Sequence, residues 1–362
     1  MTLTLTLSQL RRYAVARSLF KPTSLLRAVN TLGFVQADPI RAPARAQDLT
    51  LRHRVSGYLA GALEQRYPKL PLEEAFFVNY GFVPPAVHAV LQRREPRTPW
   101  SPQQQAQAQD VLAYVAEHRL VHPRQVAADL AQGKVRTWFG GSAHASTQLL
   151  DGMHYRGLLR VAGREGGTRL YALTAPPPHD PPALETQLKE LVRLIVALYA
   201  PLPLASFNQL VGYLGQGAAP WKAACRAAAQ RVLAQLPQAR LDGVNWCWPA
   251  GEAPASRRWQ VQPRLRLLTP FDPVVWDRRR FELLWGWRYR FEAYLPAPQR
   301  QLGYYAMPLL WADQVIGWGN LSLQAGQLQA QLHYLAGHPP ADAGYAAALE
   351  AELAALVHFL HL

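Results

Sequence analysis

Apolar residues repeat at helical spacing through the middle of the chain, and these repeats are followed by short alternating runs. Between residues 103 and 174 the pattern predicts three helices, at 104–118, 123–131 and 143–156. They are followed by a hairpin with strands at 158–161 and 168–171. The third helix stops at Gly157, a suitable C-terminal residue. This order is typical of a winged helix, which either places its third helix in DNA or only joins proteins and spaces domains.

Similar units are predicted on both sides of this segment. The first has helices at 9–18 (with Ser8 as N-cap), 21–33, 57–66 and 84–93 and a strand at 34–38. The later unit has helices at 184–199, 204–214 and 220–236, followed by a hairpin at 240–246 with an Asp242-Gly243 turn. The chain is therefore predicted to contain two or three versions of one small unit.

The last third of the chain changes to the rhythm of strands. Short runs at 288–295, 304–310, 315–321 and 328–334 are separated by Gly or Pro turns, and an alanine-rich helix is expected at 341–361. The predicted fold class is α+β, with tandem winged-helix domains followed by a small C-terminal β-barrel or sheet domain. Proline-containing linkers at 95–102, 175–182 and 249–256 suggest domains at 1–98, 99–176, 183–250 and 257–362.

Positive charge is gathered in two blocks of the chain. The formal net charge is +14, and residues 1–60 hold nine Lys or Arg against two Asp or Glu. Residues 257–300 hold ten against four, whereas residues 301–362 hold none against four. Blocks of this kind are typical of phosphate binding, so duplex DNA is the expected partner. The alternative is charge that only keeps the protein in solution.

Composition also narrows the location and the chemistry. Cys225 and Cys247 form neither a disulfide framework nor a metal-binding spacing, which fits a reducing compartment. The first residues lack a signal-peptide pattern, and the most apolar stretch, 194–205, is too short to span a bilayer. We expect a cytoplasmic, nucleoid-associated monomer without a membrane segment. Neither the C-terminal histidines nor the glycine-rich turn at 163–167 completes a metal or nucleotide site, so no cofactor is expected.

The strand expected at 34–38 carries the strongest candidate for chemistry. Side chains alternate along a strand, so Val35 and Ala37 would face the core while Gln36 and Asp38 share the other face. An amide and a carboxylate at this spacing can hold one water molecule between them. The alternatives are a solvated strand face, or an Asp38 that only pairs with a nearby arginine.

The segment 32–55 resembles the AlkZ/YcaQ-like DNA glycosylases, winged-helix enzymes that excise alkylated or crosslinked bases. Gln36-Ala37-Asp38 matches the Gln–apolar–Asp form of their catalytic motif, which belongs to the YcaQ-like branch. The resemblance continues in Ala44-Arg45-Ala46, Leu49-Thr50-Leu51, Leu268-Thr269-Pro270-Phe271-Asp272-Pro273, Val275-Trp276-Asp277-Arg278, Tyr289-Arg290 and Gly303-Tyr304-Tyr305. Many relatives have a tryptophan and a histidine near 74–82, where this chain has Phe76 and Val78, a difference that bears on substrate range.

The resemblance implies a monofunctional DNA glycosylase that hydrolyses the N-glycosidic bond of alkylated or interstrand-crosslinked purines, for base excision or crosslink repair. Asp38 would stabilise positive charge on the sugar and take a proton from water, and Gln36 would orient the water or the sugar. None of the five lysines neighbours this strand in sequence, so no Schiff-base lyase step is expected. The main alternative is a winged-helix transcriptional regulator without catalysis.

The predicted DNA-binding residues fall into three groups: arginines after Asp38, residues of the central winged helix, and the basic run before the last strands. They are Arg41, Arg45, Arg52, Arg54, Thr147, Gln148, Arg156, Arg164, Arg169, Arg278 and Arg279. Aromatic residues are interleaved with the last group, as in surfaces that stack on bases. The alternatives are a solvated hairpin for the wing arginines, core packing for the aromatics, and a protein-interaction module for the whole chain.

Overall fold

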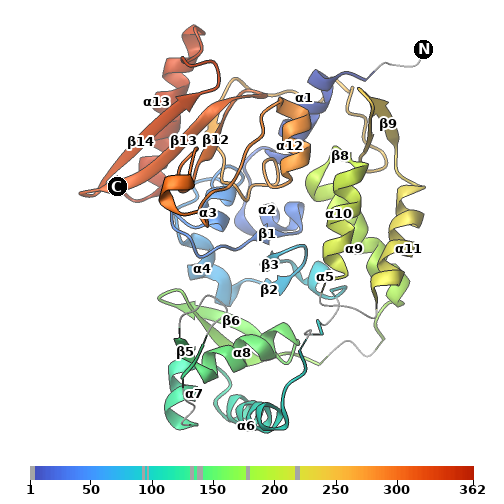
Figure 1. The fold of residues 1–362 in the computed structure, drawn as a ribbon, viewed down its shortest axis with the longest axis vertical. Helices are drawn as coiled ribbons and strands as arrows, with labels where there is room; N and C mark the ends of the chain where they lie inside the picture. Colours follow the sequence, from blue (N-terminus) through green and yellow to red (C-terminus); the bar gives the residue numbers. More distant parts are fainter. Residues whose placement is uncertain are drawn as a thin grey trace. The chain divides into compact units, whose positions relative to one another are not determined.

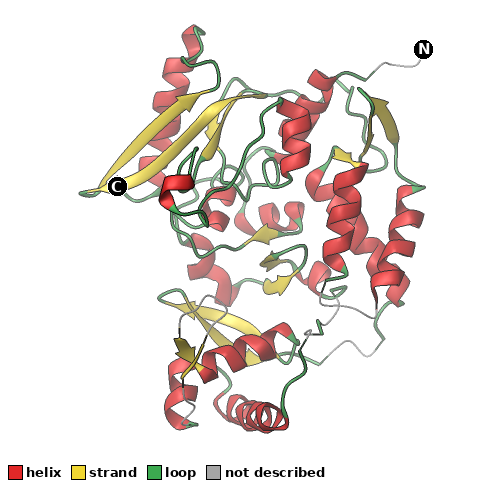
Figure 2. Cartoon of the chain, in the orientation of Figure 1, coloured by secondary structure: helices red, strands yellow, loops and turns green. Residues whose placement is uncertain are grey.

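The computed structural model describes residues 5–91, 94–95, 98–130, 134–136, 142–176, 180–216 and 221–362 (Figure 1). The chain forms two compact units. Unit 1 consists of residues 1–63, 192–211 and 229–362, and unit 2 of residues 64–191 and 212–228. Both units mix helices with strands (Figure 2), which confirms the α+β class. The four consecutive domains and their winged-helix character stay predictions.

Unit 1 begins with α1 (Leu7–Ser18), α2 (Leu25–Leu32), β1 (Val35–Gln36) and α3 (Ala46–Leu51). The N-cap of α1 is Thr6, whose hydroxyl accepts from the Gln9 amide while the Gln9 side chain accepts from the Thr6 amide. The prediction of Ser8 as the cap is wrong, because this reciprocal pair starts the helix earlier and leaves Ser8 inside it. Helix α2 ends as predicted at Gly33, which has φ 72°.

The middle of the chain contributes three helices and a small sheet. Helices α9 (Leu184–Tyr199), α10 (Leu204–Leu214) and α11 (Lys222–Leu233) follow the predicted positions, and each has residues in both units. The sheet in unit 1 has the order β8-β10-β9, formed by Leu202–Pro203, Val244–Cys247 and Gln238–Leu241. All its pairs are antiparallel, and the predicted Asp242-Gly243 turn joins β9 to β10.

The C-terminal part of unit 1 is a curled antiparallel sheet (Figure 1). Its strands are β11 (Leu265–Leu267), β12 (Met307–Trp311), β13 (Gln314–Gln324) and β14 (Gln327–Tyr334), in that order. Helix α13 (Ala343–Phe359) lies against β11, because the Glu352 carboxylate accepts a hydrogen bond from the Leu267 amide at 2.9 Å. The predicted terminal helix and three of the predicted strands are therefore present.

The strand predicted at 288–295 is wrong. Helix α12 (Arg278–Trp285) ends at Gly286, and the chain then runs as a loop to residue 306, with one 3-10 turn at Ala297–Gln299. The loop is held by side chains: the Glu292 carboxylate accepts from the amides of Gln301 and Leu302 at 2.8 and 2.7 Å. The Tyr289 hydroxyl donates to the Ala306 carbonyl at 2.7 Å. The alternating aromatic residues of this segment therefore pack in a loop, without the backbone hydrogen bonds of a β-strand.

Unit 2 contains the central helix–hairpin segment. Its elements up to residue 129 are most of α4 (Ala62–Arg66), which begins in unit 1, and then η1 (Tyr67–Lys69), β2 (Glu73–Phe76), β3 (Tyr80–Val83), α5 (Pro85–His88), α6 (Pro102–His118) and α7 (Pro123–Asp129). They are followed by β4 (Lys134–Arg136), β5 (Ser142–His144), α8 (Ala145–Tyr155), β6 (Leu159–Glu165) and β7 (Thr168–Leu173). The order α6, α7, α8 and the hairpin β6–β7 agrees with the prediction. Helices α4 and α5 are shorter than predicted, and residues 92–93 lie outside the described residues.

The core of unit 1 joins the beginning of the chain to its last third. One cluster packs Val15 of α1 and Leu19, the residue after this helix, against Leu268, Val274 and Phe281. A second packs the other side of α1 against the β10 region and α12. Helix α1 and the last third of the chain are therefore held in a shared core. Among the described residues, no helix combines the length and the apolar character that crossing a membrane requires.

Candidate active site

Gln36 and Asp38 are both buried. Their exposed fractions are 6% and 8%, so the alternative of a solvated strand face is excluded. The strand itself ends at Gln36, and Ala37 is half-buried. The described part of the chain places no basic side chain in an ion pair with Asp38, so the second alternative, an internal arginine partner, is not found either. A buried carboxylate without a neutralising partner is the feature that distinguishes this site.

The Gln36 amide is fixed by Trp276. The indole N–H of Trp276 donates to Gln36 Oε1 at 2.6 Å, and the indole ring lies 5.4 Å from the ring of Tyr199. Because the carbonyl side of the amide is used in this bond, the amide nitrogen is the end left to donate to another group. The sequence contains no signal for this contact, since the two residues are 240 positions apart.

Asp38 is held by the backbone. Its Oδ1 accepts from the Ile40 amide at 2.9 Å, and its own amide donates to Gln47 Oε1 of helix α3 at 3.3 Å. Burial raises the pKa of Asp38, and the hydrogen bond from Ile40 opposes this increase. Only one carboxylate oxygen has a partner among the described residues. The other is available to a water molecule or a sugar.

An aromatic wall lies near Asp38. The Asp38 charge contributes, after burial, to a raised pKa of both Tyr294 and Tyr305. The Tyr305 hydroxyl is paired with Thr269 Oγ1 at 2.9 Å, whereas residue Tyr294 is 73% exposed. Phe291 connects the two, with ring centroids 5.8 Å from Tyr294 and 5.5 Å from Tyr305. The sequence did not indicate that Phe291 and Tyr294 belong to the site, because their alternating pattern predicted a strand at 288–295.

Two predicted phosphate ligands are internal. Both Arg54 and Asp272 are 0% exposed at their side chains, and the guanidinium binds the carboxylate through two bonds of 2.7 and 2.9 Å. Arg52 pairs with the buried Glu352 of α13. These interactions correct the expectation for Arg52 and Arg54: their charges are neutralised inside the protein, so they are not available to DNA. Arg41 is exposed and Arg45 is half-buried.

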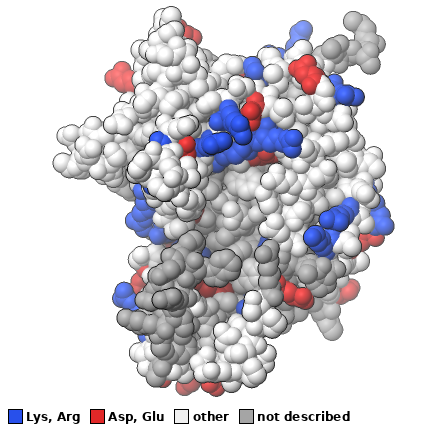
Figure 3. All heavy atoms as spheres, in the orientation of Figure 1, with Lys and Arg blue, Asp and Glu red and all other residues white. Residues whose placement is uncertain are grey.

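Three exposed arginines of unit 1 lie around an open hollow. Arg279, Arg288 and Arg290 line a volume of ≈ 740 Å³ together with Phe291 and other residues of α12 and its following loop. Figure 3 shows a large group of basic side chains over this part of the molecule. Arg279, Arg288 and Arg290 all belong to the basic run that the sequence suggested for nucleic-acid binding, and the structure places them at one hollow. Arg278 also lines the hollow, but its guanidinium donates to the carbonyls of Val275 and Pro270 at 2.6 and 2.9 Å.

The predicted residues of unit 2 divide between surface and internal positions. Thr147 is half-buried and Gln148 is exposed on α8. Arg156 lies 3.6 Å above the Trp100 ring, and the wing arginines bind acids. Those pairs are Arg164–Glu74 at 2.5 Å and Arg169–Asp151 at 2.7 Å. The wing arginines are thus partly neutralised within unit 2, which weakens the expectation that they hold phosphates. Among the residues described, no group of His, Cys, Asp or Glu is arranged to hold a metal ion.

Two comparisons relate the chain to known proteins. Residues 29–359 match the model of a family described as DNA glycosylase AlkZ-like. The solved structure of the Streptomyces sahachiroi DNA glycosylase AlkZ is similar, with a TM-score of 0.64 and 13% sequence identity. That similarity covers 99% of this chain and 97% of the other chain. At such low identity it shows a shared fold.

Proposed function

The chain belongs to the AlkZ-like DNA glycosylase family, and from this premise we propose that it hydrolyses the N-glycosidic bond of an alkylated purine through Asp38. As a family member it is a DNA repair enzyme that binds DNA and removes a base. This assignment replaces the alternative of a regulator without catalysis. The buried Asp38 carboxylate, which no described cation neutralises, is the observation that carries the proposal.

Asp38 supplies the negative charge that the reaction needs. As the base leaves, positive charge develops on the sugar, and a carboxylate in a low-dielectric site stabilises it more strongly than it would in water. The same carboxylate takes a proton from the attacking water. An ion pair with an arginine would compete with both tasks. The free oxygen of Asp38 therefore matters as much as its position.

Gln36 is a positioning group. Its carbonyl is occupied by Trp276, so its amide nitrogen donates to the attacking water or to a sugar oxygen. The water then lies between a donor and an acceptor, an arrangement that orients it without changing its protonation. An alkylated purine leaves with its positive charge neutralised, so one carboxylate and one amide are sufficient for its release. The Gln–apolar–Asp form of the motif supports our proposal that the chain belongs to the YcaQ-like branch.

The reaction stops at the abasic site. A glycosylase that also cuts the strand forms a Schiff base through an amine. The ranges that make up unit 1 contain one lysine, Lys21, which is exposed before α2. Water is therefore the proposed nucleophile. The cations around the hollow, together with Arg41 and Arg45, hold the DNA phosphates, and the openness of the hollow beside Phe291 suits a bulky adduct or an interstrand crosslink.

A base-release assay tests this function. Duplex DNA carrying N7-methylguanine is incubated with the protein, and free 7-methylguanine is measured by mass spectrometry. We expect base release, with strand cleavage only after treatment with alkali. A duplex with a nitrogen-mustard crosslink then tests the wider substrate range. Absence of base release from both duplexes would contradict the proposal, and strand cleavage without alkali would contradict the monofunctional mechanism.

A further inference from the structure

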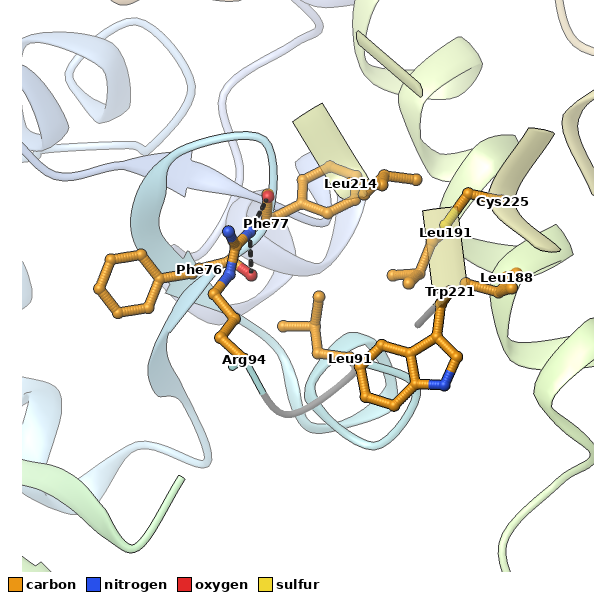
Figure 4. A pocket seen from close by; sticks show the side chains of 9 residues that line it. All are labelled: Phe76, Phe77, Leu91, Arg94, Leu188, Leu191, Leu214, Trp221 and Cys225. Atoms are coloured by element: carbon orange, nitrogen blue, oxygen red, sulfur yellow. Dashed lines mark hydrogen bonds between the residues drawn. The ribbon is translucent and has the colours of Figure 1, made fainter. Parts of the chain in front are cut away.

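A small pocket lies beside Arg94 in unit 2 (Figure 4). Its volume is ≈ 20 Å³, which is about the space of one water molecule. The Arg94 guanidinium already donates to the carbonyls of Phe76 and Phe77 at 3.4 and 2.7 Å. This pocket is therefore too small for a ligand larger than water. Unfilled hydrogen-bonding capacity is found instead in unit 1, along β14.

Strand β14 is the last strand of the C-terminal sheet (Figure 1). Among the described residues, no strand pairs with its outer edge. Proteins normally protect such an edge with charged residues, proline or a β-bulge. The chain has no Asp, Glu, Lys or Arg between Asp313 and Asp342, β14 contains no proline, and its register with β13 has no shift. The edge is therefore open to pairing with another strand.

The ladder between β13 and β14 shows which backbone groups point outward. The Leu335 amide donates to the Ile316 carbonyl at 2.9 Å, and the same register continues along β14. Because alternate residues of an antiparallel strand bond to each neighbour, the odd-numbered residues of β14 bond to β13. The N–H and C=O groups of Leu328, Ala330 and Leu332 therefore point away from the sheet.

The sequence centred on Ala330 is Leu-Gln-Ala-Gln-Leu, which reads the same in both directions. If two copies of this strand pair antiparallel about Ala330, Leu328 lies opposite Leu332 of the second copy, and Gln329 lies opposite Gln331. A hydrogen-bonded pair at this centre requires the backbone groups of Ala330 to point outward, as they do. The symmetry of the sequence and the direction of the backbone groups therefore select the same register.

The side chains also fit this pairing. Leu328, Ala330 and Leu332 are half-buried on one face of β14, and Leu323, the cross-strand neighbour of Leu328, is 45% exposed. In the paired arrangement Leu332 of the second copy lies next to Leu328 and Leu323, which removes apolar surface from water. The glutamines of the opposite face then form a ladder in which amides can bond to one another.

From the open edge and its symmetric sequence, we infer that β14 pairs with β14 of a second copy of this chain. The two C-terminal sheets then form one continuous sheet about a two-fold axis at Ala330. A second copy is the partner because it supplies the matching sequence in the register that the backbone allows. The inference is independent of the glycosylase reaction, since β14 is not part of the candidate active site, and it departs from the monomer expected from the sequence.

The first experiment measures the mass of the full-length protein by sedimentation equilibrium over a range of concentrations. We expect the mass to rise from that of one chain to that of two chains and then to stop, because a two-fold pairing closes the assembly. A wild type that stays monomeric at about 100 µM would overturn the inference. Assemblies larger than two chains would also overturn it, because they require a pairing without this axis.

The second experiment tests the register with charges at Gln329 and Gln331, which are exposed and lie opposite each other across the proposed pair. Gln329→Lys combined with Gln331→Lys places like charges opposite each other, so the dimer should weaken by about tenfold at low salt. The matched variant, Gln329→Lys combined with Gln331→Glu, places opposite charges together and should dimerise at least as tightly as the wild type. Equal dimerisation of the two variants would overturn the register.

A mixing experiment controls for the added net charge. The variant with lysine at both positions is combined with a variant that carries Gln329→Glu and Gln331→Glu. Each is expected to dimerise poorly alone, whereas the mixture should form a dimer with one copy of each. A mixture as monomeric as its components would overturn the pairing of these two positions.

A backbone variant tests the centre of the pair. Ala330→Pro removes an N–H that points to solvent in the single chain, so the fold should be retained, with a melting temperature close to that of the wild type. The dimer loses a hydrogen bond from each copy at its axis and should weaken by at least about tenfold. A folded Ala330→Pro that dimerises like the wild type would overturn the inference.

Discussion

The indole nitrogen of Trp276 lies 2.6 Å from Oε1 of Gln36 and joins two parts of the chain that are 240 residues apart. The glutamine ends the short strand β1, and the tryptophan precedes the N-cap of α12. Because the bond fixes which end of the amide carries its donors, it converts a flexible side chain into an oriented group. In the proposed mechanism, Trp276 is therefore a positioning residue that acts through Gln36.

The first prediction concerns this bond. In Trp276→Phe the amide of Gln36 is free to rotate, and we expect base excision to slow by about tenfold, the effect of losing one hydrogen bond in the transition state. The melting temperature should change little. Trp259→Phe removes another indole N–H, which donates to Ala253, and should leave the rate unchanged. An unchanged rate in Trp276→Phe would show that Gln36 needs no such support.

The second prediction concerns stability and pH. The folded pKa of Asp38 is raised by burial, so the charged carboxylate destabilises the fold above that pKa. Below the ordinary carboxyl pKa of about 3.9 both states are protonated and the cost disappears. Asp38→Asn should therefore raise the melting temperature at pH 7, and the difference should vanish at low pH. A variant that is less stable than the wild type at pH 7 would contradict this assignment.

Removal of Arg54 should destabilise the protein. The variant Arg54→Ala leaves Asp272 buried and charged without its partner, and unfolding by urea should show a loss of about 3–5 kcal/mol. Replacing both residues by leucine should restore part of this loss, because no unpaired charge remains. If Arg54→Ala unfolds at the wild-type urea concentration, the ion pair is not a structural element and its role must be sought in DNA binding.

Arg279 should behave in the opposite way. Its side chain is exposed at the hollow, so Arg279→Ala should leave the urea midpoint unchanged. Binding to unmodified duplexes should weaken equally for all sequences, and the salt dependence should fall by about one phosphate contact. Arg12→Ala removes an exposed charge that does not line the hollow and is the matched control. A loss confined to one DNA sequence would indicate base recognition in place of phosphate binding.

Local pattern was sufficient for most of the fold. Helical spacing located α9 and α10, and the glycines at 33 and 157 ended their helices with φ of 72° and 70°. The failure at 288–295 has a physical cause. Its alternating aromatics imitate a strand, but hydrogen bonds made by the side chains of Glu292 and Tyr289 hold this loop in place without a ladder.

Only part of the candidate site could be predicted from the sequence. The short motif from Gln36 to Asp38 was enough to locate two polar groups, since both lie in one local segment. Trp276 and Tyr294, by contrast, lie more than 200 residues away in the chain, so spacing contains no information about them. Arginine positions were a poor guide for the same reason: whether Arg54 meets DNA or Asp272 is decided by tertiary packing.

The most direct test of the account is the single-turnover rate of Asp38→Asn on duplex DNA that contains N7-methylguanine. We predict a rate about 10²–10⁴-fold below that of the wild type, the range expected for loss of a catalytic acid–base group, with DNA affinity retained. Asp242→Asn, in the exposed β9–β10 turn, should react at the wild-type rate. If Asp38→Asn is folded, binds the duplex and excises the base at the wild-type rate, then Asp38 is not the catalytic carboxylate.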